Sequence, residues 1–304
     1  MKTTSLPQAA SHLVPVLICA LAVFLLSAMD AVMKSLVIAI GVYNTVLWRS
    51  MLASLVAGGI WTAGERRLPP RKVMRVHALR VVVVAIVLIL FFWGLARLPL
   101  AEGIALSFIA PLIALYLAAL LLGERIRREI VWASLAGMGG VVIIMVGQFG
   151  RESYTQEAML GTAAILASAL FYAYNLVLMR QQAQIAKPIE IAFFQNLGLV
   201  VLMGAAAPWL AVELPREFWL PIAGVTALSL TGQFMMSWAY GRAEAQYLIP
   251  TEYTAFVWAI ALGWVFFAEP VEWTTLAGAG LIIVGCLVAA RTNPKLAEPI
   301  EATI

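Results

Sequence analysis

Three charged residues stand inside the first two long apolar runs of this sequence. Asp30 and Lys34 are four residues apart with the acid first, which on a helix places them on one face in the order that favours an ion pair. Arg49 lies in the second run. A charge in an apolar segment is costly unless it is paired or faces water. These residues therefore either pair and join two helices, or one of them binds a charged group of a ligand.

Glu252 is the corresponding candidate in the second half of the chain, two residues after Pro250. Proline interrupts the hydrogen-bond ladder of a helix and frees backbone carbonyl groups. A carboxylate beside free carbonyls could bind a cation or carry a proton. The alternative is that Glu252 stands at the start of a helix and reaches water there.

Aromatic and amide side chains recur within the same kind of apolar run. Each of them alone is more often a contact between helices than a ligand group. Together they could line a pocket that accepts a planar ring or holds a cation over a ring face. These residues are Trp93, Tyr172, Tyr174, Asn175, Gln195, Gln233, Trp238 and Tyr253.

The composition indicates which elements must position these side chains. Of the 304 residues, 63% are hydrophobic and 12% are charged, and the mean hydropathy is +0.94. A soluble protein is about half apolar and about a quarter charged. These values exclude a disordered chain, a cytosolic enzyme and a nucleic-acid binder. They indicate an all-α integral membrane protein, for which the lipid bilayer is a partner.

Ten apolar stretches approach the length of about 20 residues that a membrane-spanning helix needs. The predicted helices are 12–37, 43–63, 73–95, 99–122, 129–147, 159–180, 188–210, 217–239, 245–268 and 273–290. Short connections between them hold most of the charges. Arg80 is expected to reach the inner headgroups with its long side chain, and Glu102 to lie at the outer surface.

The basic residues set the orientation of these helices, because cytoplasmic connections are enriched in Lys and Arg. With the N-terminus in the cytoplasm, the outer connections hold only Arg97, Arg151 and Arg216 of the 20 basic residues, and most of the others fall in the inner ones. We therefore expect a multi-pass protein of the bacterial cell inner membrane with both termini cytoplasmic.

An internal repeat is visible when the chain is compared with itself. The segment FFWGLAR at 91–97 matches MSWAYGR at 236–242, and LAGMG at 135–139 matches LAGAG at 276–280. Each copy then holds five helices, with boundaries at 1–150 and 151–304. Because five is odd, the second copy crosses the membrane in the opposite sense. Inverted repeats of this kind are typical of secondary transporters that bind their substrate near the midplane.

With this arrangement of helices, the chain resembles the drug/metabolite transporter superfamily, in the branch with two EamA domains. The resemblance rests on MDAVMK and WRS in the first two helices and on LPLAEGIALSFIAPLIALYLAALLLGERI, with a weaker second copy at FFAEPVEW. It implies ten-helix metabolite carriers with a cavity lined by helices 1, 3, 4, 6, 8 and 9. The motifs are most similar to those of S-adenosylmethionine and riboflavin uptake carriers. In the second copy, AEP replaces the usual GE followed by an aliphatic residue.

The sequence and the resemblance together predict a secondary transporter. It would move a small organic metabolite, similar to S-adenosylmethionine, riboflavin or an amino acid, by alternating access, with proton coupling as one option. An amino-acid or drug exporter on the same scaffold and a non-transporting membrane scaffold are the alternatives. No Gly precedes a Lys, so there is no phosphate-binding P-loop. We expect no enzyme activity, no cofactor, no metal site and no nucleic-acid partner, and either a monomer or a homodimer.

Overall fold

The computed structural model describes residues 8–64, 68–122, 128–148, 155–183, 185–240, 242, 248 and 251–292. Every regular element in these ranges is a helix. The helices are α1 (Gln8–Gly64), α2 (Arg71–Leu95), α3 (Leu100–Ser107), α4 (Ala110–Leu122), α5 (Arg128–Gln148), α6 (Gln156–Ala183), α7 (Pro188–Gly204), α8 (Ala207–Leu210), η1 (Arg216–Phe218), α9 (Trp219–Tyr240), α11 (Thr254–Phe267) and α12 (Trp273–Thr292).

The long α1 consists of two membrane helices joined at Gly41. This residue has φ 79° and ψ 156°, a backbone conformation that residues with a side chain rarely adopt. The two arms of α1 correspond to the predicted helices 12–37 and 43–63. One glycine therefore replaces a connecting loop on this side of the molecule.

The remaining helices agree with the predicted membrane crossings. Four segments within the described residues, in α1, α2, α6 and η1–α9, are each long and apolar enough to cross a membrane alone. The helices α5, α7, α11 and α12 are shorter apolar crossings, and α3 and α4 form one interrupted crossing. With the two arms of α1 counted separately, the described part of the chain supplies ten crossings, so the predicted all-α membrane fold is confirmed.

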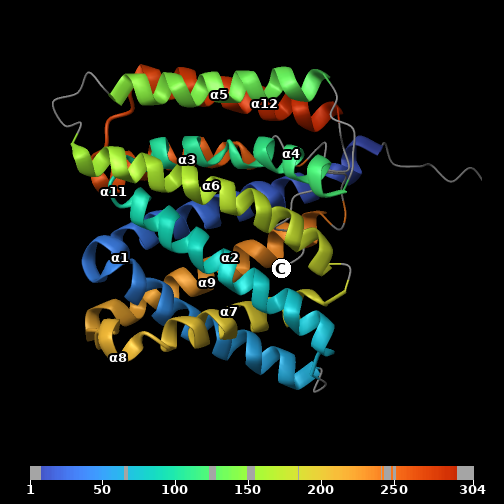
Figure 1. Ribbon diagram of the computed structural model, residues 1–304, viewed down its shortest axis with the longest axis vertical. Helices are drawn as coiled ribbons and strands as arrows, with labels where there is room; N and C mark the ends of the chain where they lie inside the picture. Colours follow the sequence, from blue (N-terminus) through green and yellow to red (C-terminus); the bar gives the residue numbers. More distant parts are fainter. Residues whose placement is uncertain are drawn as a thin grey trace, which may run out of the picture.

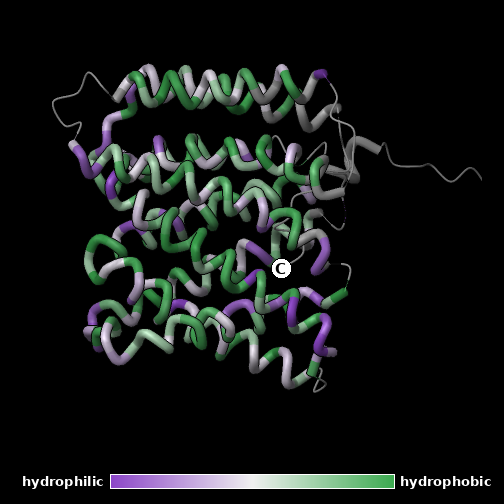
Figure 2. Tube along the Cα trace, viewed as in Figure 1, coloured by the Kyte–Doolittle hydropathy of each residue, from purple (hydrophilic) through white to green (hydrophobic). Residues whose placement is uncertain are grey.

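The crossings alternate in direction across the bundle (Figure 1). The start of α1 and the end of α12 lie on the same side, at the right in this view, and α2 runs opposite to α9. Apolar residues follow the helices along their length, whereas hydrophilic residues concentrate toward the two ends of the bundle (Figure 2). This is the distribution that a hydrocarbon layer between two aqueous faces imposes.

Helices α5 and α12 pack side by side at one edge of the bundle (Figure 1). Their backbones meet at Gly140 and Gly278, where an added Cβ would lie 2.4 and 2.5 Å from the carbonyl oxygen of the opposite glycine. Small residues allow such close approach between membrane helices, and van der Waals contact then holds the pair. The glycine-rich stretches noted in the sequence thus form one helix crossing.

The repeat predicted from FFWGLAR and MSWAYGR has a matching local structure in both copies. The Arg97 guanidinium lies 3.4 Å from the centre of the Trp93 ring, and Arg242 lies 4.2 Å from that of Trp238. Each arginine also donates from Nη1 to the carbonyl oxygen of its tryptophan, at 3.0 and 3.3 Å. The same cation–π cap therefore ends the third helix of each copy, on opposite sides of the bundle.

Candidate functional site

Lys34 lies in the first arm of α1, and its side chain is almost fully buried. Its ammonium group forms an ion pair with Glu269, in the link between α11 and α12, and donates to the Leu98 carbonyl oxygen at 2.6 Å. The ring of Phe267 covers it, with its centre 4.8 Å from Nζ. The sequence suggested pairing with Asp30 on the same helix, but the carboxylate that Lys34 contacts is Glu269.

Glu269 connects three parts of the chain at this end of the bundle. One carboxylate oxygen contacts Lys34, and the other accepts from the Leu100 backbone N–H at 2.7 Å, at the start of α3. Gly263 leaves room for this side chain, because an added Cβ would lie 2.9 Å from Oε2. We name the ion pair of Lys34 and Glu269, with Leu98 and Leu100, the outer latch. It lies at the end opposite the start of α1 and the end of α12, which is the outer end in the orientation that the sequence predicts.

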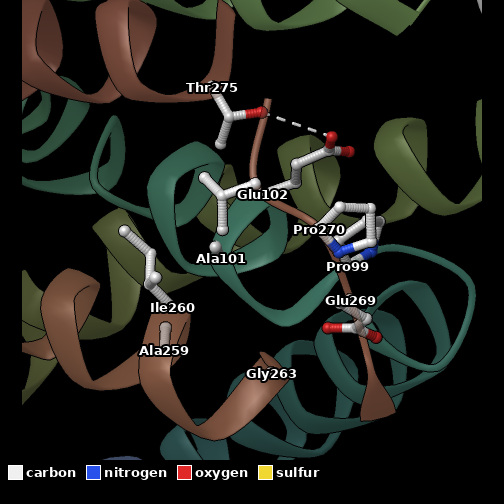
Figure 3. A pocket seen from close by; sticks show the side chains of 10 residues that line it. Pro99, Ala101, Glu102, Ala259, Ile260, Gly263, Glu269, Pro270 and Thr275 are labelled. Atoms are coloured by element: carbon white, nitrogen blue, oxygen red, sulfur yellow. Dashed lines mark hydrogen bonds between the residues drawn. The ribbon is translucent and has the colours of Figure 1, made fainter. Parts of the chain in front are cut away.

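A narrow crevice, with no room for a water molecule inside it, lies beside the outer latch between α3, α11 and α12. Glu102 lines it, is 2% exposed, and accepts a hydrogen bond from Thr275 at 3.3 Å. Figure 3 shows its carboxylate turned toward α12, while that of Glu269 lies beyond Pro99 and Pro270. The expectation that Glu102 lies at the surface is wrong, because α12 covers it and provides a hydroxyl partner.

Asp30 lies in the first arm of α1 and Arg49 in the second, and the Asp30 carboxylate is near enough to attract the Arg49 guanidinium. Arg49 is half-buried, and its Nε atom has no hydrogen-bond acceptor among the described residues. Both residues lie more than two helical turns from the Gly41 bend, deeper in the membrane than the outer latch. Arg49 therefore retains a donor that a ligand could use.

Two helix interruptions meet inside the bundle. Phe108, between α3 and α4, has φ −64° and ψ −7°, and Tyr253, just before α11, has φ −69° and ψ −12°. Their rings pack edge to face, with centroids 5.4 Å apart. Interrupted helices at corresponding positions of two inverted copies mark the midplane site of many carriers. Glu252 is half-buried beside Tyr253, while Pro250 lies outside the described residues.

The other predicted pocket residues are distributed over several places. Tyr172 packs against the core formed by α3, α4, α5 and α12, and Asn175 is 3% exposed on the same helix, α6. Gln195 on α7 is buried, and its Nε2 atom has no hydrogen-bond partner among the described residues. Tyr174 and Gln233 are half-buried. Trp93 and Trp238 stack on arginines rather than with the Phe108–Tyr253 pair.

A polar cluster that the sequence did not suggest lies between α2, α6 and α7. Arg80 is 2% exposed and donates from Nε to Asn175 at 3.1 Å and from Nη1 to Gln182 at 2.6 Å. Gln182 in turn contacts His77, which contacts Glu190. The expectation that Arg80 extends to the inner headgroups is wrong, because amide groups on α6 hold its guanidinium inside. The spacing of His77 and Arg80, which share one helix face, was the signal that could have found this cluster.

Comparison with known proteins identifies the family to which this chain belongs. Two stretches of the chain, residues 13–146 and 159–291, each match the model of the EamA-like transporter family. The chain belongs to the EamA-like transporter family. It is accordingly a membrane transporter and not an enzyme.

Several individual relatives agree with the EamA assignment. The pseudopaline exporter of Pseudomonas aeruginosa is 30% identical over 281 residues, which cover 91% of this chain and 96% of that protein. A riboflavin transporter of Brucella anthropi is 27% identical and covers 71% of this chain and 76% of its own length. A protein of known crystal structure matches this chain with a TM-score of 0.59 and 19% identity. The match covers 93% of this chain and 97% of that one, so the two share a fold.

Proposed function

We propose that this protein is a secondary transporter that moves a small organic metabolite across the bacterial inner membrane by alternating access. Substrate would bind near the midplane, between the interrupted helices around Phe108 and Tyr253 and the charged pair of Asp30 and Arg49. Two inverted units, at 1–150 and 151–304, would exchange roles as the site opens to one side and then the other, with both termini in the cytoplasm.

The outer latch is the observation that carries this proposal. An ion pair buried in the membrane is costly to assemble, and its partners come from α1, the α2–α3 link and the α11–α12 link. A contact that ties the outer ends of separate helices closes the path from outside without touching the deeper charges. Such a contact suits a carrier that opens to one side at a time.

Uptake into proteoliposomes tests the proposal directly. Purified protein would be assayed with radiolabelled S-adenosylmethionine, riboflavin and amino acids, with protein-free vesicles as the control. Saturable accumulation of one solute is the expected result. Binding of a solute to the purified protein without any flux in either direction would instead support a non-transporting membrane receptor.

Export is the second candidate function, since the pseudopaline exporter is a relative over nearly the whole chain. An inverted-repeat scaffold permits both directions, so the gradient and the coupling ion decide which one operates. Counterflow from preloaded vesicles, compared with uptake into empty ones at equal proton gradients of both signs, separates the two directions.

A further inference from the structure

Arg80 holds a full positive charge in the bundle interior with only neutral hydrogen-bond acceptors. Its two hydrogen bonds go to the amide oxygens of Asn175 and Gln182 on α6. Neither of these hydrogen bonds uses its Nη2 atom. An arginine does not lose its charge in a protein, and a guanidinium matches a carboxylate better than any other partner. The N–H groups of Nη2 are therefore suited to bind an acidic group.

The orientation of the Gln182 amide is fixed by Arg80. A guanidinium can only donate, so the atom of Gln182 that faces Nη1 must be the oxygen. The Gln182 nitrogen then lies 2.5 Å from Nδ1 of His77, and it can only donate to it. Nδ1 of His77 is therefore an acceptor without a proton. The imidazole proton is on Nε2, which lies 3.2 Å from the Glu190 carboxylate.

A second proton on His77 is incompatible with this arrangement. Protonated Nδ1 would face the NH₂ group of Gln182, so the amide would have to turn and present its oxygen to the imidazole. That turn removes the acceptor of Arg80 Nη1. A carboxylate bound at Arg80 would replace the lost acceptor, and so a carboxylate and a proton should favour each other's binding through Gln182.

The surroundings of His77 agree with a proton site that is reached from one side. The charged groups that act on the imidazole are Glu190 on α7 and Arg80 on α2, whereas α6 contributes the neutral Gln182. Phe194 stacks on the ring at 5.3 Å. Glu190, in the first turn of α7, is the most exposed acidic or basic member, with 13% of its side chain accessible. The start of α7 lies toward the end of the bundle at which α1 begins and α12 ends (Figure 1).

We propose that Arg80, Gln182 and His77 form a linked binding site for a carboxylate and a proton. The acidic group binds the free guanidinium N–H groups of Arg80, and the proton binds Nδ1 of His77. The role of this site in transport rests on the proposed carrier function, and it would restrict the substrate class to metabolites that carry a carboxylate. If this cluster served only to join α2 to α6, it would need neither the charge of Arg80 nor the imidazole of His77.

Acetate binding to the purified protein tests the proposal without knowledge of the substrate. Thermal unfolding would be followed against sodium acetate at constant ionic strength, with acetamide as the uncharged isostere, at pH 6 and pH 8. We expect acetate to raise the melting temperature and acetamide to leave it unchanged, with tighter acetate binding at pH 6. In Arg80→Gln the acetate affinity should fall at least about tenfold, because a charge-assisted bond is lost. The exposed Arg216→Gln should behave as the unaltered protein.

Two further measurements keep the test decisive if Arg80→Gln does not fold. His77→Gln should still bind acetate but with the same affinity at pH 6 and pH 8. The chain has two histidines, so in His12→Ala the imidazole ¹⁵N signals report on His77 alone. They should show the Nε2–H tautomer at pH 8 and should change with acetate but not with acetamide.

Equal acetate responses in Arg80→Gln and Arg216→Gln, or His77 signals that acetate leaves unchanged, would overturn the proposal. Because these measurements require no transport, they test the linked binding site separately from the proposed carrier function. Loss of acetate binding alongside intact solute uptake would refute the linked site only, and acetate binding without any flux would refute the carrier.

Discussion

Lys34 is stabilised at its position by partners from other elements rather than by its own helix. The Glu269 carboxylate, the Leu98 carbonyl and the Phe267 ring surround the ammonium group on sides that water would otherwise occupy. Each of these belongs to a segment that must move if the outer face opens. The ammonium group of Lys34 therefore joins three separate segments at this end of the bundle.

Replacing Lys34 by Met should strongly destabilise the closed conformation, because Glu269 would remain buried without its partner. Removing one member of a buried pair costs about 3–5 kcal/mol. We expect a lower melting temperature for Lys34→Met and recovery of most of the loss in the double variant Lys34→Met/Glu269→Gln. Scanning fluorimetry measures both.

Arg97→Met is the matched control for Lys34→Met, since Arg97 pairs with Glu157 at the exposed surface and such pairs contribute about 0–1 kcal/mol. A loss in Lys34→Met no larger than that in Arg97→Met would show that the outer latch does not hold the closed state.

Glu252 remains the predicted coupling residue beside the Tyr253 interruption. Replacing it by Gln keeps the shape but removes the charge, so transport should be abolished or should lose its dependence on pH while the protein stays folded. Solute flux across proteoliposomes between pH 5.5 and pH 8 measures this. Glu213→Gln, an exposed position between α8 and η1, is the control. Unchanged flux and pH dependence in Glu252→Gln would remove it from the site.

The end of α11 is the element that places Glu269. Ala268 has φ 53° and ψ 34°, in the left-handed region, and the backbone N–H of Glu269 bonds back to Gly263 at 3.1 Å. This cap turns the chain so that the Glu269 side chain returns toward α1. The matching residue of the first copy is Gly123, which lies outside the described residues.

Ala268→Gly should stabilise the protein slightly, by about 0.5–1 kcal/mol, because it removes the steric cost of a side chain in the left-handed conformation. Chemical unfolding in mild detergent with a denaturant series measures the change. Ala261→Gly, in the regular part of the same helix, should destabilise by about 1 kcal/mol instead. Equal losses in both variants would contradict the role of Ala268 as a helix cap.

The whole molecule is arranged so that equivalent residues of the two copies face opposite sides. The arginine caps at Arg97 and Arg242 end corresponding helices at opposite ends of the bundle, and the interruptions at Phe108 and Tyr253 meet in its interior. When the first copy is exchanged with the second, the contacts between α2 and α6 correspond to those between α9 and α1. The bundle therefore has two related halves of opposite orientation.

Labelling of single cysteines tests this orientation in cells. With Cys19 and Cys286 replaced by Ala, Glu213→Cys should react with a membrane-impermeant maleimide added outside, whereas Lys72→Cys should react only after the membrane is permeabilised. Both positions are exposed in the structure, so the two cysteines should react equally once the membrane is permeabilised. The opposite pattern would place the termini outside and contradict the basic-residue distribution.

The sequence determined the membrane class, the crossings and the repeat, because these follow from local composition. About 20 apolar residues in a row permit little besides a spanning helix. The paired motifs around Trp93 and Trp238 predicted the repeat, and the structure added that each motif forms an arginine cap. Helix ends were harder to predict. Helix α7 ends at Gly204 and the separate α8 begins at Ala207, with Pro208 in its first turn, where the sequence predicted one helix to 210.

Only the tertiary structure decided which charges meet. Asp30 and Lys34 lie one turn apart in the sequence, yet Lys34 pairs with Glu269, and Arg80 is held by Asn175 and Gln182 of a different helix. A side chain in a membrane bundle can turn toward any of several neighbouring helices, and spacing along one helix says nothing about which of them carries the partner. The choice depends on helix packing across long stretches of chain, and there the small residues and the bends, such as Gly41, have the decisive effect.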